Sequence, residues 1–112
     1  MYVYQLDWNH FDKCLAENTM VILGVYAEDT VIDGLFYGIL KQLQKKISTQ
    51  IVVGMMEKSM FEERYAHTNQ VYPKTLIFQN KRLLDTLYGI KNCNRLMKEM
   101  HLHFSEKNSR IA

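Results

Sequence analysis

Apolar residues follow two different periods along this chain, and each change of period marks a new element. Unbroken or alternating apolar runs are typical of strands, whereas apolar residues that recur every three to four positions are typical of amphipathic helices. The runs that predict strands are Tyr2–Leu6, Met20–Ala27, Gln50–Met56, Lys74–Gln79 and Arg82–Tyr88. The segments that predict helices are Trp8–Glu17, Ile32–Ile47, a short stretch that opens at Ser59, and Asn92–Phe104.

Polar residues at the ends of these segments support the helices. Asp7 is placed to accept a backbone hydrogen bond as the N-cap of the first helix, and Ser59-Met-Phe-Glu62 has the spacing of a capping box. The long second helix has the clearest periodicity. Its apolar stripe comprises Ile32, Leu35, Phe36, Ile39, Leu40, Leu43 and Ile47.

The elements follow the order β-α-β-α-β-α-β-β-α. Alternating strands and helices predict parallel pairing in the first part of the chain. A hairpin through a tight Asn80–Lys81 turn predicts an antiparallel edge at the end. We therefore expect an α/β sandwich built on a mixed sheet.

The composition fits one domain. The chain has 112 residues, 47% of them hydrophobic, and a domain takes about 150 residues. We expect a single domain over residues 1–104 and a flexible tail over 105–112. The net charge of +2 is too small to argue for nucleic acid or a membrane, and the longest apolar run, Met20–Ala27, is too short to cross a bilayer. We expect a cytoplasmic protein.

Three features resemble the thioredoxin family over residues 1–104. The run Val21–Glu28 is similar to the central strand before the family's redox motif, and Pro73–Phe78 is similar to its cis-proline and following strand. Gly89 follows Pro73 by sixteen residues, as does the glycine after the family's last strand. The resemblance implies a three-layer α/β/α sandwich with the thioredoxin-like fold.

The chain departs from that family where the chemistry takes place. Members carry Trp-Cys-x-x-Cys at the turn into the long helix, where the helix N-terminus lowers the pKa of the attacking thiol. Here Thr30 takes the place of the attacking cysteine and Asp33 that of the resolving one, while Gly24 and Gly54 stand where the resemblance implies a buried acid and a lysine. We expect no dithiol chemistry, no catalytic residue and no enzymatic activity, with Thr30 serving as a helix N-cap.

The main hypothesis is a redox-inactive binding or adaptor protein that recognises a protein or peptide. Its candidate surface comprises Glu28, Asp29, Thr30, Asp33, Tyr72, Pro73 and Gly89, with Tyr72 as an exposed aromatic anchor. The resemblance implies that the backbone before the proline pairs with an extended peptide. Two simpler explanations stay open: the acids stabilise the helix N-terminus, and the proline serves only the fold.

The cysteines supply an alternative function. Cys93 opens the last helix and is a candidate reactive thiol for a mixed disulfide, although it also lies on an apolar stripe. We expect Cys14 to be a buried thiol. A structural homodimer is a further alternative, and the oligomeric state stays undecided. The spacing of histidines and cysteines predicts no metal site, and we expect no cofactor and no nucleic-acid partner.

Overall fold

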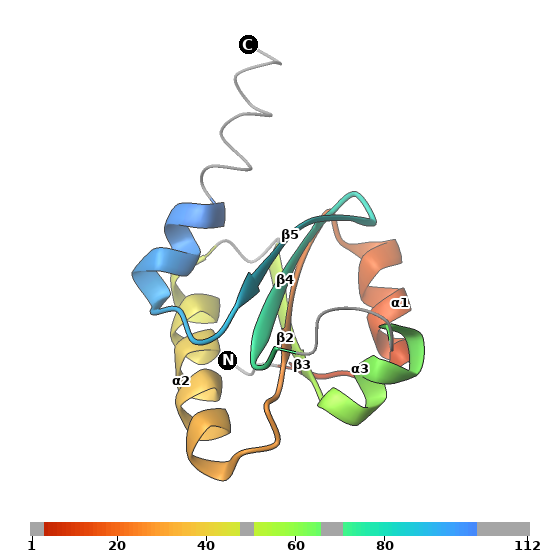
Figure 1. Ribbon diagram of the computed structural model, residues 1–112. Coiled ribbons are helices and arrows are strands. Elements are labelled where there is room, and N and C mark those ends of the chain that lie inside the picture. The colour runs from red at the N-terminus through yellow and green to blue at the C-terminus, as the bar shows by residue number, and fades with distance from the viewer. Residues whose placement is uncertain (1–3, 48–50, 66–70, 101–112) are drawn as a thin grey trace.

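The computed structural model describes residues 4–47, 51–65 and 71–100 and contains one five-stranded mixed sheet (Figure 1). The strands are β1 (Tyr4–Gln5), β2 (Met20–Val25), β3 (Ile51–Met56), β4 (Lys74–Gln79) and β5 (Arg82–Tyr88). The labelled helices are α1 (Trp8–Glu17), α2 (Thr30–Lys46) and α3 (Lys58–Tyr65), and residues 93–100 are also helical.

The sheet has the order β1-β3-β2-β4-β5. The strands β1 and β3 and the strands β3 and β2 pair in parallel, whereas β4 is antiparallel to both β2 and β5. Crossovers through α1 and α2 produce the parallel pairs, because a parallel connection needs a helix-length return. The expected combination of parallel strands and an antiparallel hairpin is therefore confirmed.

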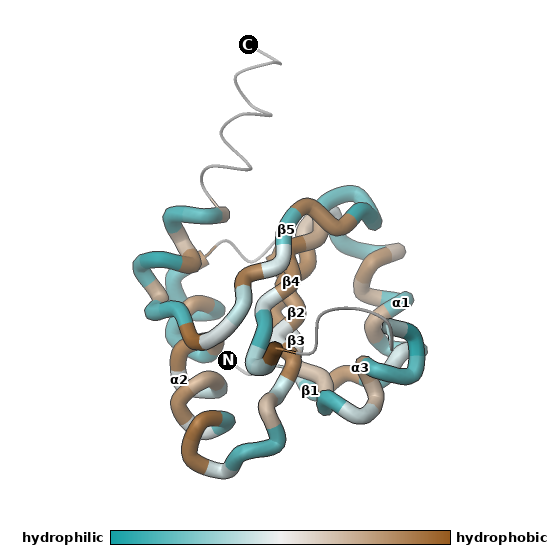
Figure 2. The backbone as a smooth tube through the Cα atoms, in the orientation of Figure 1, coloured by the Kyte–Doolittle hydropathy of each residue, from teal (hydrophilic) through white to brown (hydrophobic). Residues whose placement is uncertain are grey.

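Helices cover both faces of the sheet and make two separate cores. Figure 1 shows α2 and residues 93–100 on one side and α1 with α3 on the other. Figure 2 shows the central strands as largely hydrophobic and the helices as mixtures of hydrophobic and hydrophilic positions, as expected when a sheet is buried on both faces. The three-layer sandwich is confirmed.

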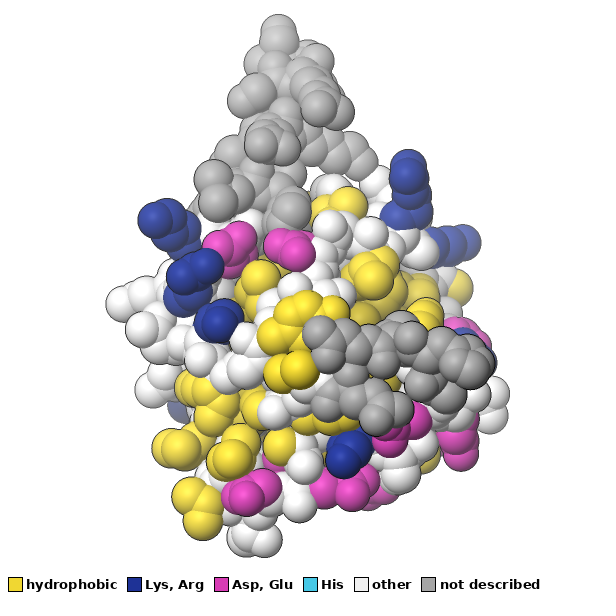
Figure 3. Space-filling model, in the orientation of Figure 1, with side chains coloured by type: hydrophobic (Ala, Val, Ile, Leu, Met, Phe, Trp, Pro, Cys, Tyr) yellow, Lys and Arg dark blue, Asp and Glu magenta, His cyan; other side chains and the backbone are white. Residues whose placement is uncertain are grey.

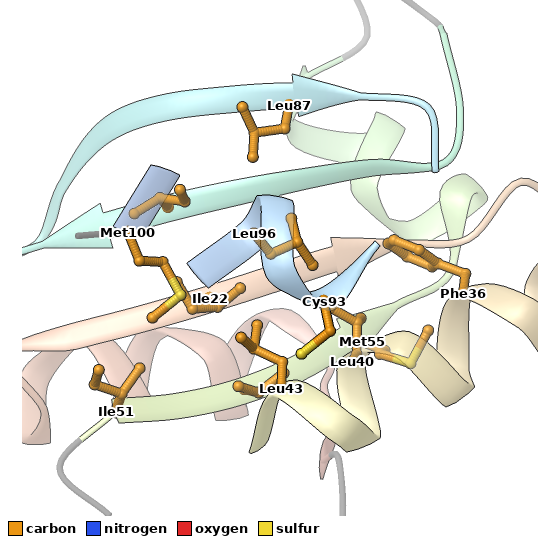
Figure 4. Packing of buried hydrophobic residues seen from close by; sticks show 12 residues of the cluster. Ile22, Phe36, Leu40, Leu43, Ile51, Met55, Leu87, Cys93, Leu96 and Met100 are labelled. Atoms are coloured by element: carbon orange, nitrogen blue, oxygen red, sulfur yellow. The ribbon is translucent and has the colours of Figure 1, made fainter. Parts of the chain in front are cut away.

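The core beneath α2 is largely aliphatic, and the core beneath α1 is rich in aromatic rings. In Figure 4 the side chains of Phe36 and Leu40 on α2 and of Cys93 and Leu96 point toward one another over the sheet. On the other face Trp8, Phe11 and Phe61 are among the rings that pack together. Trp8 and Phe11 meet edge to face with their ring centroids 5.6 Å apart.

Most element boundaries agree with the sequence expectation. The bounds of α1, β4 and β5 match, and Asn80 and Lys81 form the hairpin turn with φ values of 51° and 69°. Asp7 caps α1 by accepting a hydrogen bond from the backbone N–H of His10 at 2.8 Å. The strand β2 ends at Val25, two residues earlier than expected.

Two cap predictions were wrong. The N-cap of α2 is Asp29, so Thr30 is the first helical residue and not the cap. The helix α3 begins at Lys58, which places Ser59 inside the first turn and excludes the predicted capping box. The end of the last predicted helix, residues 101–104, and the predicted tail, 105–112, lie outside the described residues.

In the described ranges, none of the helices is both long enough and apolar enough to cross a membrane.

Candidate functional site

Three loops meet at one end of the sheet. Val25 at the end of β2 pairs with Lys74 at the start of β4, and Lys74 pairs with Tyr88 at the end of β5. The residues that follow Val25, precede Lys74 and follow Tyr88 therefore share this end. Gly89, with a φ of 79°, donates its backbone N–H to the carbonyl of Pro73 at 2.7 Å.

The acidic residues at the start of α2 hold the turn together. Asp29 accepts hydrogen bonds from the backbone N–H groups of Val31 and Ile32, which satisfies two donors that the helix leaves unpaired. Asp33 reaches back and accepts from the backbone N–H of Ala27 at 2.8 Å. The two residues therefore have structural roles at the positions around the missing redox motif.

Hydrocarbon side chains cover Gly24, the position at which the resemblance implied a buried acid. A Cβ atom added to Gly24 would overlap the Leu40 side chain and lie 2.9 Å from the ring of Phe36. At Gly54, a Cβ atom would similarly collide with the side chain of Leu6. Both positions lie in strands beneath packed side chains, so the backbone approaches its covering residues too closely for a side chain.

A cavity of about 490 Å³ opens beside the turn, and its lining residues are Tyr26, Glu28, Asp33 and Glu57. We call it the acidic cavity. Glu28 has a φ of 60° and accepts a hydrogen bond from the backbone N–H of Ser59 at 3.3 Å, which links the turn to α3. The hydroxyl of Tyr26 accepts a hydrogen bond from the Gln5 amide, and burial raises the pKa of this phenol.

Three carboxylates of the acidic cavity give it a negative character at neutral pH. Among the described residues, no group of three or more histidine, cysteine or acidic side chains is arranged to hold a metal ion.

Tyr72 is not the exposed anchor that the sequence suggested. Its ring is partly buried, meets Phe61 edge to face at 6.5 Å, and lies close to the ammonium groups of Lys58 at 5.3 Å and Lys74 at 4.6 Å. The hydroxyl is buried. Burial, assisted by the negative charge of Glu62, raises the pKa of Tyr72 to about 12.

The side chain of Tyr72 is packed against its neighbours, whereas its backbone polar groups lack partners among the described residues. Tyr72 precedes β4, and the Tyr72–Pro73 peptide bond is cis. Its backbone N–H and C=O form no hydrogen bond with the part of the chain that the structure describes. Pro73 itself is buried.

Lys74 is a feature that the sequence analysis missed. It is 1% exposed, and its ammonium group lies over the rings of Tyr72, Phe61 and Tyr88 at 4.6, 4.8 and 5.7 Å. Burial lowers the pKa of this amine, and the charge of Glu62 acts in the opposite direction. The signal in the sequence was the alternation of β4, because Lys74 shares a face with the buried Leu76.

Exposed apolar side chains were also missed. Val31 and Leu35 lie one turn apart on α2 and are 73% and 59% exposed, and Ile90, just after β5, is 39% exposed. We call Val31 and Leu35 the apolar patch. Leu35 was expected to face the core with the rest of the helix stripe, and that expectation was wrong. In Figure 3 hydrophobic side chains gather over α2 and the segment after β5, with acidic side chains below them.

The two cysteines are free and lie in different cores. Cys93 is 6% exposed and belongs to the cluster beneath α2, whereas Cys14 packs against the aromatic cluster on the opposite face. A disulfide between them is excluded by the intervening sheet. Cys14 is only partly buried, and this burial raises the pKa of its thiol.

The fold has counterparts among solved structures. No family model matches the sequence, and no curated protein matches it. A point mutant of thioredoxin from Halobacterium salinarum superposes with a TM-score of 0.75 at 12% identity, over 89% of this chain and 88% of that one. Thioredoxin from Plasmodium falciparum gives 0.72 at 20% identity, over 88% and 97%.

Chloroplastic thioredoxin z gives a TM-score of 0.72 at 14% identity, over 88% of this chain and 90% of that one. Identities this low establish the architecture and not the activity. The chain therefore has the thioredoxin fold, as the order of elements and the resemblance predicted.

Proposed function

We propose that this protein is a redox-inactive thioredoxin-fold module that binds a protein or peptide through the loops at Glu28–Asp33, Tyr72–Pro73 and Gly89–Asn92. The observation that carries the proposal is the hydrogen bonding of the turn at the start of α2. Asp29 and Asp33 use their carboxylates to hold backbone N–H groups around the positions where thioredoxins carry reactive thiols.

The residue at each position supports the proposed absence of dithiol chemistry. The hydroxyl of Thr30 cannot form a disulfide. The carboxylate of Asp33 accepts a hydrogen bond from the backbone N–H of Ala27. Leu40 fills the space that the side chain of an acid at position 24 would need. Thiol exchange needs an accessible thiolate, and Cys93 is enclosed in the core.

Two observations support peptide binding at the same end of the sheet. The backbone of Tyr72 has unused hydrogen-bonding groups within the described residues, as strand addition by an extended peptide requires. Val31 and Leu35 also present apolar surface to solvent beside this end. A bound peptide would pair with the backbone of Tyr72 and cover the side chains of Val31 and Leu35.

The redox half is tested by the reduction of insulin disulfides with dithiothreitol as the thiol donor. We expect the wild-type protein to leave the rate at the buffer level. A variant with Cys14→Ser and Cys93→Ser is the matched control, because it keeps the fold's surface loops. An acceleration by the wild type that this variant lacks would overturn the redox-inactive assignment.

The binding half is tested by panning a random peptide library displayed on phage. We expect selected peptides to bind the wild type and to lose affinity for Leu35→Asp. Leu83→Asp is the control, because Leu83 is similarly exposed, at 48%, on β5. Selected peptides that are equally affected by both variants, or by neither, would place recognition away from these loops.

A further inference from the structure

The apolar patch and the acidic cavity flank the same helix start. Val31 lies in the first turn of α2, two residues after the cap Asp29, and Leu35 lies one turn further along. Glu28 and Asp33, which line the acidic cavity, belong to the same turn. A ligand that crosses the start of α2 therefore meets an apolar surface on one side and carboxylates on the other.

The acidic cavity has the size and the acceptors for a cationic side chain. Its volume of about 490 Å³ lies in the range of small-ligand pockets, about 300–1,000 Å³. Asp33 and Glu28 each use one oxygen on a backbone N–H group, which leaves the second oxygen of each as an acceptor. Neither lysine nor arginine is among its lining residues.

The ammonium groups of two nearby lysines contact an aromatic ring outside the acidic cavity. The ammonium groups of Lys58 and Lys74 both lie over the ring of Tyr72, which does not line the acidic cavity. Neither of these two lysines is among the residues that line the acidic cavity.

We propose that the partner is an extended peptide segment that carries an apolar side chain close to a lysine or arginine. This inference rests on the proposed function and specifies its ligand. The segment pairs with the backbone of Tyr72, the apolar side chain covers Val31 and Leu35, and the cation enters the acidic cavity. The same carboxylates repel phosphate groups, so a nucleic acid does not fit this surface.

The probe is the pool of phage-selected peptides, resynthesised and measured by isothermal calorimetry. We expect the pool to be enriched in sequences with an apolar residue near lysine or arginine. Replacing that basic residue by glutamine, or changing Glu57→Lys, should each weaken binding about tenfold or more, and added salt should weaken it as well. Glu57 is chosen for the charge reversal because it is exposed and its side chain forms no hydrogen bond with the described residues.

Glu17→Lys is the matched control. Glu17 lies near the Asn80–Lys81 turn at the other end of the sheet, so the same charge change there should leave affinity unaltered. Selected peptides that depend on Leu35 but carry no basic residue and ignore Glu57→Lys would overturn this inference and keep the proposed function. If no selected peptide depends on Leu35 or Glu57 for its affinity, both this inference and the proposed binding function are rejected.

Discussion

Leu40 packs so closely over Gly24 that any side chain at residue 24 would collide with it. This contact joins the middle of α2 to the central strand β2 without space between them. The resemblance implied an acid at residue 24, and the packed core leaves no room for its side chain. The volume that an acid needs is occupied by the core.

We predict that Gly24→Ala destabilises the protein by about 1–3 kcal/mol, because an added methyl group in a closed core forces its neighbours to move. Gly24→Asp should cost more, since it also buries a carboxylate without a partner. Urea denaturation monitored by circular dichroism measures both.

The controls for this prediction are in α2. A Cβ atom at Gly34 or Gly38 meets no other atom within 4 Å. Alanine there should stabilise the helix by roughly 0.5–1 kcal/mol, because glycine is a poor helix former. Equal effects at Gly24 and Gly38 would show that the close contact with Leu40 does not constrain the core.

The second prediction concerns the cap of α2. Asp29→Ala should lower the free energy of unfolding by about 0.5–2 kcal/mol, because two backbone N–H groups lose their acceptor. Thr30→Ala should have a much smaller effect, since the side chain of Thr30 does not form the cap. The reverse order in thermal or urea unfolding would restore Thr30 as the capping residue.

The third prediction uses the phenol of Tyr72. Its pKa is raised from 10.0 to about 12 in the folded protein. Between these values the folded state binds more protons than the unfolded state, so this group's contribution to stability is complete below pH 10 and is lost as the pH rises toward 12. Tyr26 also has a raised pKa, so ultraviolet titration of the tyrosines should show a late component that Tyr72→Phe removes.

A loss of stability above pH 10 that is unchanged in Tyr72→Phe would contradict this assignment.

The fourth prediction separates the two thiols. In the native protein a thiol reagent such as Ellman's reagent should modify Cys14 slowly, because its side chain is partly exposed and its pKa is raised. Cys93 should react only after denaturation, because it is 6% exposed. Native Cys14→Ser should therefore release almost no colour. Rapid modification of Cys93 in that variant would support the single-thiol alternative.

The surface chemistry of the site was predicted only in part. The acidic turn, Pro73 and Gly89 were named as candidate site residues because each stands where the resemblance to thioredoxins implied a site residue. The roles of Asp33 and Tyr72 were not predicted, since they depend on atoms of Ala27 and Lys58 that are reached only after folding. The acidic cavity likewise combines Glu57, after β3, with residues at the start of α2.

The sequence by itself determined the order and the approximate bounds of the elements. Hydrophobic periodicity is a local property, and it specifies which face of each strand or helix must be buried. Tertiary structure decided which buried positions meet. Lys74 alternates with core residues and is enclosed by rings from α3 and β5, while Leu35 matches the helix stripe and is exposed. The physical reason is that burial depends on what the other elements place opposite a residue, and no local pattern contains that information.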